Sequence, residues 1–268
     1  MPTVISADGS VIGYATVGSG PALILVDGAM SYRDNGPSAG FAAELAGSFT
    51  VYSYDRRGRG ESGDTLPWSV EREIEDLAAV LAVAGGSAVV FGTSSGAVLA
   101  ADAANRLPGL TRLALYEPPF IVDGSREPRE ATFTGDTEAL IARGDRSGAV
   151  KKFMVHVGVP KFFVHLMPLM PAWKKLLGVA HTLPYDLRIL GETGRGVPLD
   201  AGRWSAVGAP ALVMDGGKSP RYMRHGAKAF SEALPAAEYR TLPGQTHIVK
   251  AAVIAPVVKE FLARKVSA

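Results

Sequence analysis

The stretch VVFGTSSGAVLA, residues 89–100, contains the pattern Gly-x-Ser-x-Gly at positions 92–96. The apolar run before the pattern predicts a buried strand, and the Ala-rich run after it, residues 95–107, predicts a helix that Pro108 ends. A serine in the sharp turn between such a strand and helix is exposed at the helix N-terminus, where negative charge is favoured. This context predicts that Ser94 is a nucleophile. A glycine-rich strand-to-helix turn without chemistry has the same short pattern, so other segments must support this hypothesis.

Strand and helix patterns alternate on both sides of this stretch. Short apolar and β-branched runs recur between helical runs, which predicts an α/β fold with a mostly parallel, eight-stranded sheet and helices on both faces. Residues 69–84 illustrate the helical pattern, because Ser69 can cap the N-terminus and Gly85-Gly86 ends the helix. The expected strands are residues 3–6 and 11–16, which form a hairpin, then 22–26, 49–54, 88–91, 113–116, 211–214 and 238–242, and the last helices are residues 222–234 and one that ends near Lys265.

The alternation stops in the middle of the chain. From Phe120 to Pro198 there is no strong strand pattern, only short helical stretches that Gly and Pro separate. Strands before and after this region belong to one sheet. We therefore predict a core formed by residues 1–119 and 199–268, with residues 120–198 inserted as a helical lid.

Composition excludes several classes of protein and site. The 268 residues include 28 Lys and Arg against 26 Asp and Glu, a formal net charge of +2, and we expect neither a nucleic-acid nor a membrane partner. The absence of cysteine excludes disulfides, thiolate metal sites and a cysteine nucleophile. The N-terminus lacks a secretory pattern, and the apolar runs are shorter than the ~20 residues of a membrane span. We therefore expect a cytoplasmic monomer or homodimer.

Three further segments resemble the α/β-hydrolase fold superfamily. YDRRGRGES (54–62) is similar to the D-x-R-G-x-G-x-S pattern after the fourth strand, LVDGAM (25–30) stands at the position of the oxyanion loop, and His247 follows the last strand. The order of elbow serine and late histidine is that of this superfamily. The resemblance implies that His247 is the general base. It also implies that the oxyanion is held by the N–H of Ser95 and by that of Gly28 or Ala29.

The acid of the triad departs from the usual pattern. Most α/β-hydrolases have an aspartate after the strand before last, where this chain has MDGGKSP (214–220) and Ser219 at the expected position. A serine cannot stabilise an imidazolium as a carboxylate does. Glu117, at the end of the strand after the elbow helix, is well placed, and some α/β-hydrolases draw their acid from this position. Asp215 is the alternative.

A narrower resemblance concerns the fungal zearalenone lactone hydrolases, which open a resorcylic macrolactone with a Ser-His-Glu triad. Asp27-Gly28 in the oxyanion loop, Gly-x-Ser-Ser-Gly-Ala at the elbow and Glu117 are similar to that subfamily. Residues 171–173, Pro-Ala-Trp, and 182–184, Thr-Leu-Pro, resemble its substrate-contacting lid segments. The resemblance implies that Trp173 lines the pocket, and it favours a lactonase or esterase. Asp27 can either stabilise its loop or act directly, in catalysis or in substrate binding.

The composition of the lid predicts an apolar substrate. Residues 151–173 are rich in Phe, Met, Val and Leu, which either bind the lid to the core or line a pocket. Further candidates for the pocket wall are Ala29, Met30, Phe120 and Ile121. We expect a small apolar ester or lactone as substrate and neither metal nor cofactor. The alternatives are a ligand-binding protein on a hydrolase scaffold and a carbon–carbon bond hydrolase.

Overall fold

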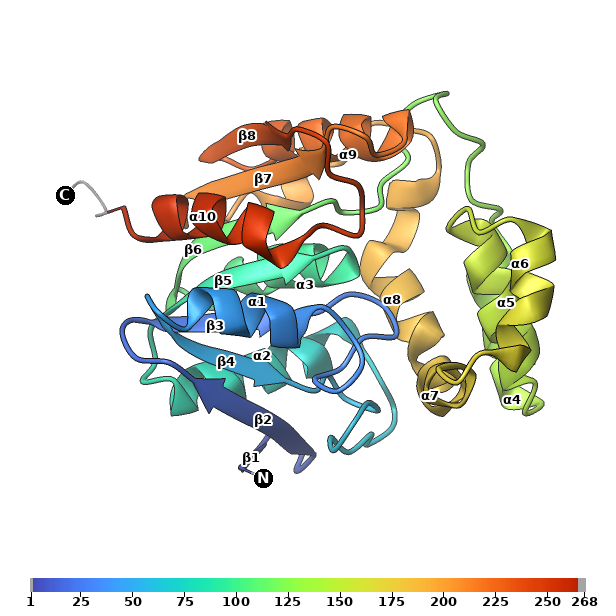
Figure 1. Cartoon of the computed structure of the whole chain (residues 1–268), viewed down its shortest axis with the longest axis horizontal. Coiled ribbons are helices and arrows are strands. Elements are labelled where there is room, and N and C mark those ends of the chain that lie inside the picture. The colour runs from blue at the N-terminus through green and yellow to red at the C-terminus, as the bar shows by residue number, and fades with distance from the viewer. Residues whose placement is uncertain (1, 265–268) are drawn as a thin grey trace.

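The computed structural model describes residues 2–264, and these contain one eight-stranded sheet in the order β1-β2-β4-β3-β5-β6-β7-β8. The first two pairings, β1 with β2 and β2 with β4, are antiparallel, and all pairings from β4 to β8 are parallel (Figure 1). The predicted fold class is confirmed. The strands are β1 (Thr3–Ile5), β2 (Val11–Val17), β3 (Ala22–Val26), β4 (Thr50–Tyr54), β5 (Ala88–Thr93), β6 (Leu110–Tyr116), β7 (Ala211–Gly216) and β8 (Ala237–Leu242).

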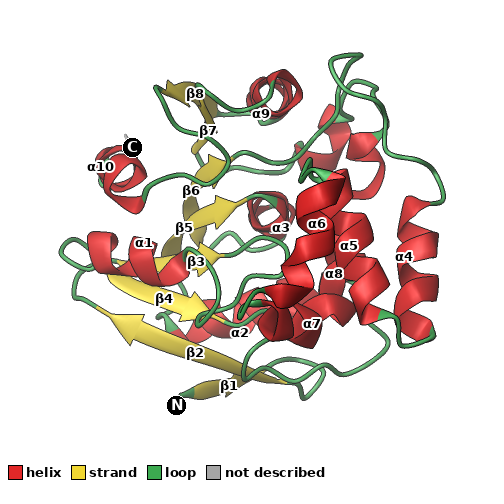
Figure 2. Cartoon of the chain, turned by 45° about the vertical axis from the view of Figure 1, so that its right-hand side comes forward, coloured by secondary structure: helices red, strands yellow, loops and turns green. Residues whose placement is uncertain are grey.

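Helices cover both faces of this sheet (Figure 2). One face packs against α1 (Ser38–Leu45) and α10 (Ala251–Leu262), and the other against α2 (Val70–Val83), α3 (Ser95–Ala104) and α9 (Arg221–Ala233). Successive residues of a strand point to opposite faces. In β3, Leu23 and Leu25 accordingly belong to the core under α1 and α10, whereas Ile24 and Val26 belong to the core under α3.

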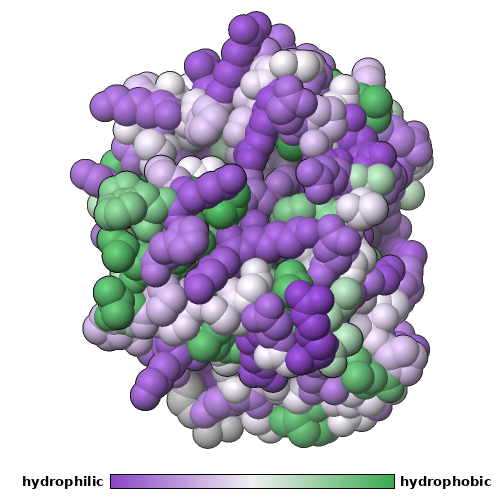
Figure 3. Space-filling model, turned by 90° about the vertical axis from the view of Figure 1, so that its right-hand side faces the viewer, coloured by the Kyte–Doolittle hydropathy of each residue, from purple (hydrophilic) through white to green (hydrophobic). Residues whose placement is uncertain are grey.

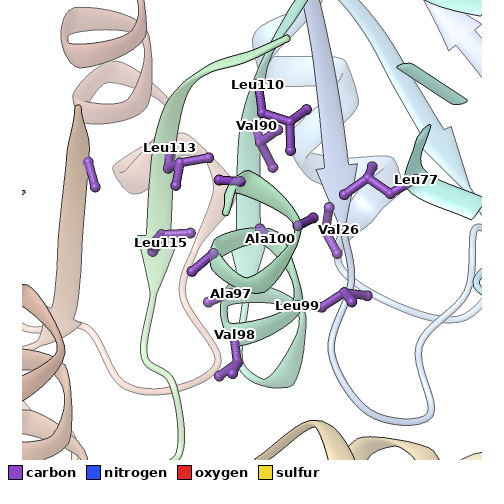
Figure 4. Close-up of a cluster of buried hydrophobic side chains, with 14 of the residues drawn as sticks. Val26, Leu77, Val90, Ala97, Val98, Leu99, Ala100, Leu110, Leu113 and Leu115 are labelled. Carbon is purple, nitrogen blue, oxygen red and sulfur yellow. The ribbon is translucent and has the colours of Figure 1, made fainter. Parts of the chain in front are cut away.

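Helix α3 is packed tightly onto the sheet. All its residues from Ser95 to Ala104 are buried, and five of them are alanines. The short alanine side chains let the helix lie close to β5 and β6, where Val90, Leu113 and Leu115 face it (Figure 4). This packing holds the N-terminus of α3 in a fixed position.

The insertion between β6 and β7 is helical from residue 133 to 194 and lies beyond the carboxyl ends of the parallel strands (Figure 1). The segments before it (117–132) and after it (195–200) contain no helix or strand, and the boundaries 120 and 198 of the lid stay a prediction. Its helices are α4 (Phe133–Ala142), α5 (Arg146–His156), α6 (Lys161–Leu166), α7 (Trp173–Val179) and α8 (Leu183–Leu190), with 3-10 turns at Met167–Leu169, Ala180–Thr182 and Gly191–Gly194.

Some boundaries differ from the prediction. Helix α1 was not predicted, because it has only eight residues and no side chain caps its N-terminus. Helix α3 ends at Ala104, not at residue 107, and α10 ends at Leu262, while Lys265 lies outside the described residues. A further 3-10 turn, Ala201–Trp204, precedes β7. In the part of the chain from residue 2 to 264, none of the helices has the length and hydropathy needed to cross a bilayer.

The lid contains a histidine that makes its stability dependent on pH. The His156 ring lies 4.4 Å from the Phe133 ring, centroid to centroid, and burial together with Arg126 and Arg129 lowers the pKa of His156 from 6.5 to about 4. A histidine with a lowered folded-state pKa contributes its full stability above pH 6.5 and loses it as the pH falls toward 4, because the unfolded chain binds the proton more tightly. We expect the melting temperature of His156→Gln to fall less than that of the wild type between pH 6.5 and pH 4.5. His165→Gln, at an exposed position of α6, is the matched control, and equal losses in wild type and His156→Gln would contradict the prediction.

Candidate active site

The residues predicted to carry chemistry lie at one edge of the sheet. Gly28 follows β3, Ser94 follows β5, Glu117 follows β6 and His247 follows β8, and these strands are parallel. Their carboxyl ends therefore lie along the same edge, which is where ligands bind in open α/β sheets. The lid helices lie on this side (Figure 2).

Ser94 stands in a strained turn between β5 and α3. Its φ is 55° and its ψ is −128°, and its N–H donates to the Tyr116 carbonyl oxygen at 2.8 Å. A Cβ at Gly92 would lie 2.8 Å from the Ala97 Cα, and one at Gly96 would collide with the Val26 carbonyl oxygen. Only glycine fits at either position. The Gly-x-Ser-x-Gly pattern is thus explained by a strand and a helix that pass at backbone contact distance.

Backbone strain is concentrated at this site. Among the described residues, the non-glycine residues with positive φ are Met30, Ser94 and Glu117. Each stands in the loop after one of three neighbouring parallel strands, β3, β5 and β6. Such conformations cost of order 1–3 kcal/mol each and persist where the surrounding structure imposes them, often at functional sites. The strain therefore coincides with the residues that the sequence selects.

Glu117 and His247 form a pair. The Glu117 carboxylate is fully buried, its Oε2 lies 2.9 Å from His247 Nδ1, and its Oε1 accepts a 2.6 Å hydrogen bond from the Gly216 N–H. When Nδ1 donates to this carboxylate, Nε2 is the ring nitrogen that can accept a proton. The structure thus brings the predicted acid and base together. Within residues 2–264 it shows no hydrogen bond between Ser94 and His247.

Asp215, the alternative acid, has other partners. Its Oδ2 accepts a 2.7 Å hydrogen bond from the Tyr239 hydroxyl and lies 3.5 Å from Arg224 Nε. Ser219, at the position where an aspartate was expected, is buried, and among the described residues its hydroxyl has no partner. Neither side chain contacts His247 through a hydrogen bond in this part of the chain.

Tyr116 connects the serine turn with the histidine loop. Its carbonyl oxygen accepts the Ser94 N–H, and its hydroxyl donates to the Thr246 carbonyl oxygen at 2.6 Å. One buried residue of β6 therefore contacts both the turn that holds Ser94 and the residue before His247. Its neighbour Glu117 holds the imidazole directly.

The loop after β3 lies against Ser94. A Cβ at Gly28 would be 2.8 Å from the Ser94 Cβ, so only a residue without a side chain fits there. Ser95 is the first residue of α3, and its N–H has no acceptor within the helix. The structure brings both predicted oxyanion donors next to Ser94.

Two buried arginines orient the peptides of this loop. Arg56 Nη1 donates to the Asp27 carbonyl oxygen at 3.2 Å, and Arg59 Nη1 donates to the Gly28 carbonyl oxygen at 2.7 Å. In a trans peptide the C=O and the following N–H point in opposite directions. The N–H groups of Gly28 and Ala29 are therefore turned away from the arginines.

The arginines belong to a buried network that reaches the lid. Asp186 of α8 accepts from Arg56 Nη1 at 2.7 Å and from Arg59 Nη2 at 2.6 Å, and it also accepts the Ser95 hydroxyl at 2.8 Å. The carboxylate of Glu73, on α2, accepts from Arg56 Nη2 at 2.7 Å and from Arg56 Nε at 2.9 Å. Burial opposes the charge of Asp186, but the guanidinium groups of Arg59 and Arg56 hold its pKa below the usual value. The network joins the lid, the elbow and the oxyanion loop.

Asp27 supports its loop. Its carboxyl group is buried and accepts a 2.7 Å hydrogen bond from the Ser38 hydroxyl of α1, and burial raises its pKa. The structure thus gives Asp27 the first of the two roles expected for it.

The pocket residues expected from the sequence fall into two groups. Met30, Ala29 and Trp173 belong to one apolar cluster with the lid residues Val150 and Leu183. Phe120 instead lies in the core, where its ring centroid is 5.9 Å from that of Trp204 and 5.2 Å from that of Phe230. The expectation that Phe120 lines the pocket is corrected, because the chain turns its side chain under α9. Ile121 is buried, with backbone hydrogen bonds to Thr193 and Gly196.

A cavity among the described residues lies away from these side chains. Its volume is about 640 Å³, and its walls are formed by α2, α4 and α8, among them Trp68, Arg129 and Leu187. None of Ser94, Glu117 and His247 lines it. We therefore place the candidate site at the strand ends, where the paired side chains are, and not at this cavity.

Residues 23–256 match the sequence profile described as the alpha/beta hydrolase family. The chain belongs to this family. It is 48% identical to an alpha/beta hydrolase from Sphaerobacter thermophilus, whose structure superposes with a TM-score of 0.88 over 97% of this chain and 99% of that one. An enol-lactonase from Burkholderia xenovorans has a TM-score of 0.73 over 98% and 100% of the chains at 19% identity, which shows the shared fold.

Curated relatives align with a shorter part of this chain. The N-formylmaleamate deformylase of Pseudomonas putida is 40% identical over 116 residues, which are 41% of each protein. The chain spans less than half the length of the curated relatives it matches first, 44% and 41%.

Four residues of the candidate site were not predicted from the sequence. These are Arg56, Arg59, Asp186 and Tyr116. The two arginines stand at variable positions of the D-x-R-G-x-G-x-S pattern, and three arginines within DRRGRG (55–60) are the signal that could have pointed to a buried charge cluster. Asp186 stands in the lid, more than 120 residues away along the chain, so only the folded structure pairs it with them.

Gly28→Ala tests the contact between the oxyanion loop and Ser94. The new Cβ would lie 2.8 Å from the Ser94 Cβ, so the loop has to move and its N–H loses the position next to the nucleophile. Loss of one oxyanion donor costs about 10²–10³-fold in kcat, and we expect a fall of that size in a variant whose circular dichroism spectrum shows that it is folded. Gly135→Ala, in α4 with open space around the added Cβ, is the control. Activity of Gly28→Ala near that of the wild type would contradict the assignment.

Asp186→Asn tests the buried network. The substitution keeps the size of the side chain but removes the carboxylate that two buried guanidinium groups share. Breaking a buried ion pair from one side costs about 3–5 kcal/mol, and we expect urea denaturation to show a loss of that size in the free energy of unfolding. Asp136→Asn, an exposed lid carboxylate paired with Lys152, should lower the free energy of unfolding far less, because water screens an exposed ion pair. Equal effects of the two substitutions would refute the role of the network.

Proposed function

We propose that this α/β-hydrolase cleaves an apolar ester or lactone through an acyl-enzyme on Ser94. One observation carries the proposal: the buried Glu117 carboxylate holds His247 at the same sheet edge where Ser94 stands in a strained turn. A nucleophile, a base and a third group that orients the base are the elements of a serine hydrolase triad.

The mechanism follows from these positions. His247 Nε2 takes the proton of the Ser94 hydroxyl as Oγ attacks the carbonyl carbon, and Glu117 stabilises the imidazolium that forms. The N–H groups of Ser95 and Gly28 hold the oxyanion of the tetrahedral intermediate, a contribution of about 3–4 kcal/mol for each donor. The imidazolium then protonates the leaving alkoxide, and water, activated by the same histidine, hydrolyses the acyl-enzyme. In a lactone the leaving alcohol stays attached to the acyl group.

Proton transfer requires a short contact between Ser94 and His247. A base and its proton donor work at about 2.6–3.2 Å, and in structures without substrate this contact is often longer. Since the described residues show no hydrogen bond between the two side chains, closure of this contact accompanies substrate binding in our proposal.

The lid supports an apolar substrate. Met30 after the oxyanion loop and Trp173 at the start of α7 are in one apolar cluster, and Ala29 packs against it. Similar proteins include an enol-lactonase and an N-formylmaleamate deformylase, which supports hydrolysis of an acyl group without specifying the substrate. The resemblance of the elbow and of Glu117 to the zearalenone lactone hydrolases makes zearalenone the first macrolactone to test.

A second candidate is a ligand-binding protein with little catalysis. The missing hydrogen bond between Ser94 and His247 among residues 2–264 favours it, because a receptor on this scaffold needs no poised base. A fluorophosphonate probe distinguishes the two functions, since it labels an activated serine only.

The test compares the wild type with Ser94→Ala, Glu117→Gln and Asp215→Asn on a short p-nitrophenyl ester and on zearalenone. We expect Ser94→Ala to abolish both labelling and turnover. Glu117→Gln removes the charge that orients His247 and should lower kcat by roughly 10³–10⁴-fold. Asp215→Asn is the matched control and should stay within about threefold of the wild type, because Asp215 binds Tyr239.

Each other outcome changes a defined part of the proposal. If only the simple ester is cleaved, the assignment of the triad stands and the macrolactone is rejected as a substrate. Loss of activity in Asp215→Asn, with Glu117→Gln active, would reassign the acid. If the wild type shows neither labelling nor turnover, the proposed enzyme function is rejected in favour of the ligand-binding protein.

A further inference from the structure

The lid carries apolar side chains on its outer surface. Phe162 and Phe163 of α6 are 69% and 59% exposed, and Leu169 and Met170, just after it, are 82% and 54% exposed. Figure 3 looks onto the side of the insertion helices and shows hydrophobic groups gathered toward its left edge beside hydrophilic ones. Contiguous apolar patches of this kind mark interaction sites on soluble proteins. We name the following set the α6 surface: Lys161, Phe162, Phe163, Leu166, Leu169, Met170, Lys174 and Lys175.

This surface is the outer side of an ordered, packed segment. Val164 in the middle of α6 is buried, and Trp173 and Met167 pack in the apolar cluster that contains Met30. The rings of Phe162 and Phe163 lie 5.7 Å apart, centroid to centroid. The inner side chains therefore hold the segment in place, while the outer ones are exposed to water.

The charge of this part of the chain has one sign. Residues 146–185 include six Lys and Arg residues and no Asp or Glu, although the net charge of the whole chain is only +2. Lys161 and Lys174 are exposed, and within residues 2–264 neither has an ion pair. Lys175 donates to the Asp34 carbonyl oxygen, and no carboxylate of the described residues forms an ion pair with it. Although the charge of the whole chain is nearly balanced, the stretch of chain that contains the exposed apolar side chains is cationic.

We propose that the α6 surface binds the surface of an anionic lipid bilayer. The phenyl rings and Leu169 would enter the boundary between headgroups and acyl chains, and the lysines would contact the lipid phosphates, as in other short cationic amphipathic segments. This proposal departs from the expectation of no membrane partner, which rested on the overall charge. It does not depend on the chemistry at Ser94.

A second copy of the chain is a less suitable partner. An interface in which two α6 surfaces meet would bring lysines of like charge together without carboxylates to pair them. Anionic headgroups supply the missing negative charge. Each lysine close to such a membrane strengthens binding by roughly fivefold.

The experiment is cosedimentation of the full chain with sucrose-loaded vesicles of mixed phosphatidylglycerol and phosphatidylcholine, and with vesicles of phosphatidylcholine alone. We expect binding to the anionic vesicles only and a strong decrease at high salt, because salt screens the lysine–phosphate attraction. The triple variant Lys161→Gln, Lys174→Gln, Lys175→Gln should bind roughly 100-fold more weakly. The double variant Phe162→Ser, Phe163→Ser should weaken binding by at least tenfold, since it removes the apolar contribution.

Two controls show whether position matters. Lys228→Gln on α9 removes a charge elsewhere, and Leu66→Ser removes an exposed apolar side chain before α2. Both should bind vesicles as the wild type does, and all variants should keep the wild-type circular dichroism spectrum and melting temperature. The proposal is overturned by no binding to anionic vesicles, by equal binding to both vesicle types, or by equal losses in variants and controls. A dimer in light scattering that Phe162→Ser, Phe163→Ser dissociates, without vesicle binding, would assign the surface to a second copy.

Discussion

The interaction on which the candidate site depends is the buried contact of Asp186 with Arg56 and Arg59. The two guanidinium groups reach the carbonyl oxygens of Asp27 and Gly28, and the carboxylate reaches the Ser95 hydroxyl. A single lid carboxylate thus pairs with two buried guanidinium groups, one of which also pairs with Glu73, and it links three segments that are far apart in the chain. Buried ion pairs are poor sources of net stability. Here the pairs serve geometry, because they orient the peptides after Asp27 and Gly28 and turn the N–H groups of Gly28 and Ala29 away from the arginines.

The strained backbone conformations of the described non-glycine residues lie at the same edge of the sheet. Met30, Ser94 and Glu117 all have positive φ, and each follows one of three adjacent strands. Parallel strands place their carboxyl ends together, so sharp turns there bring functional groups from distant segments to one place. Packing of the core offsets the free-energy cost of these conformations, because α3 is buried along its whole length and its small residues let it lie close to the strands.

One short segment of the lid, at and after α6, has two different sides. Its inner side, with Trp173 and Met167, packs near the oxyanion loop, whereas its outer side exposes Phe162, Phe163 and Leu169 among lysines. The substrate that we propose for Ser94 is an apolar ester or lactone. A lid that rests on lipid would lie where such substrates are concentrated, which connects the two proposals physically although each stands alone.

Sequence alone determined the fold class, the serine turn and the order of the strands along the chain, but not helix α1. These features depend on local patterns: alternation of apolar residues, glycines where backbones touch, and caps. It also selected Glu117 and His247 from their places after strands. Only the tertiary structure decided that Glu117, and not Asp215, meets the imidazole, that Phe120 turns into the core, and that Asp186 lies between Arg56 and Arg59. These outcomes depend on the direction of side chains on elements that are distant in sequence, and no local pattern encodes that direction.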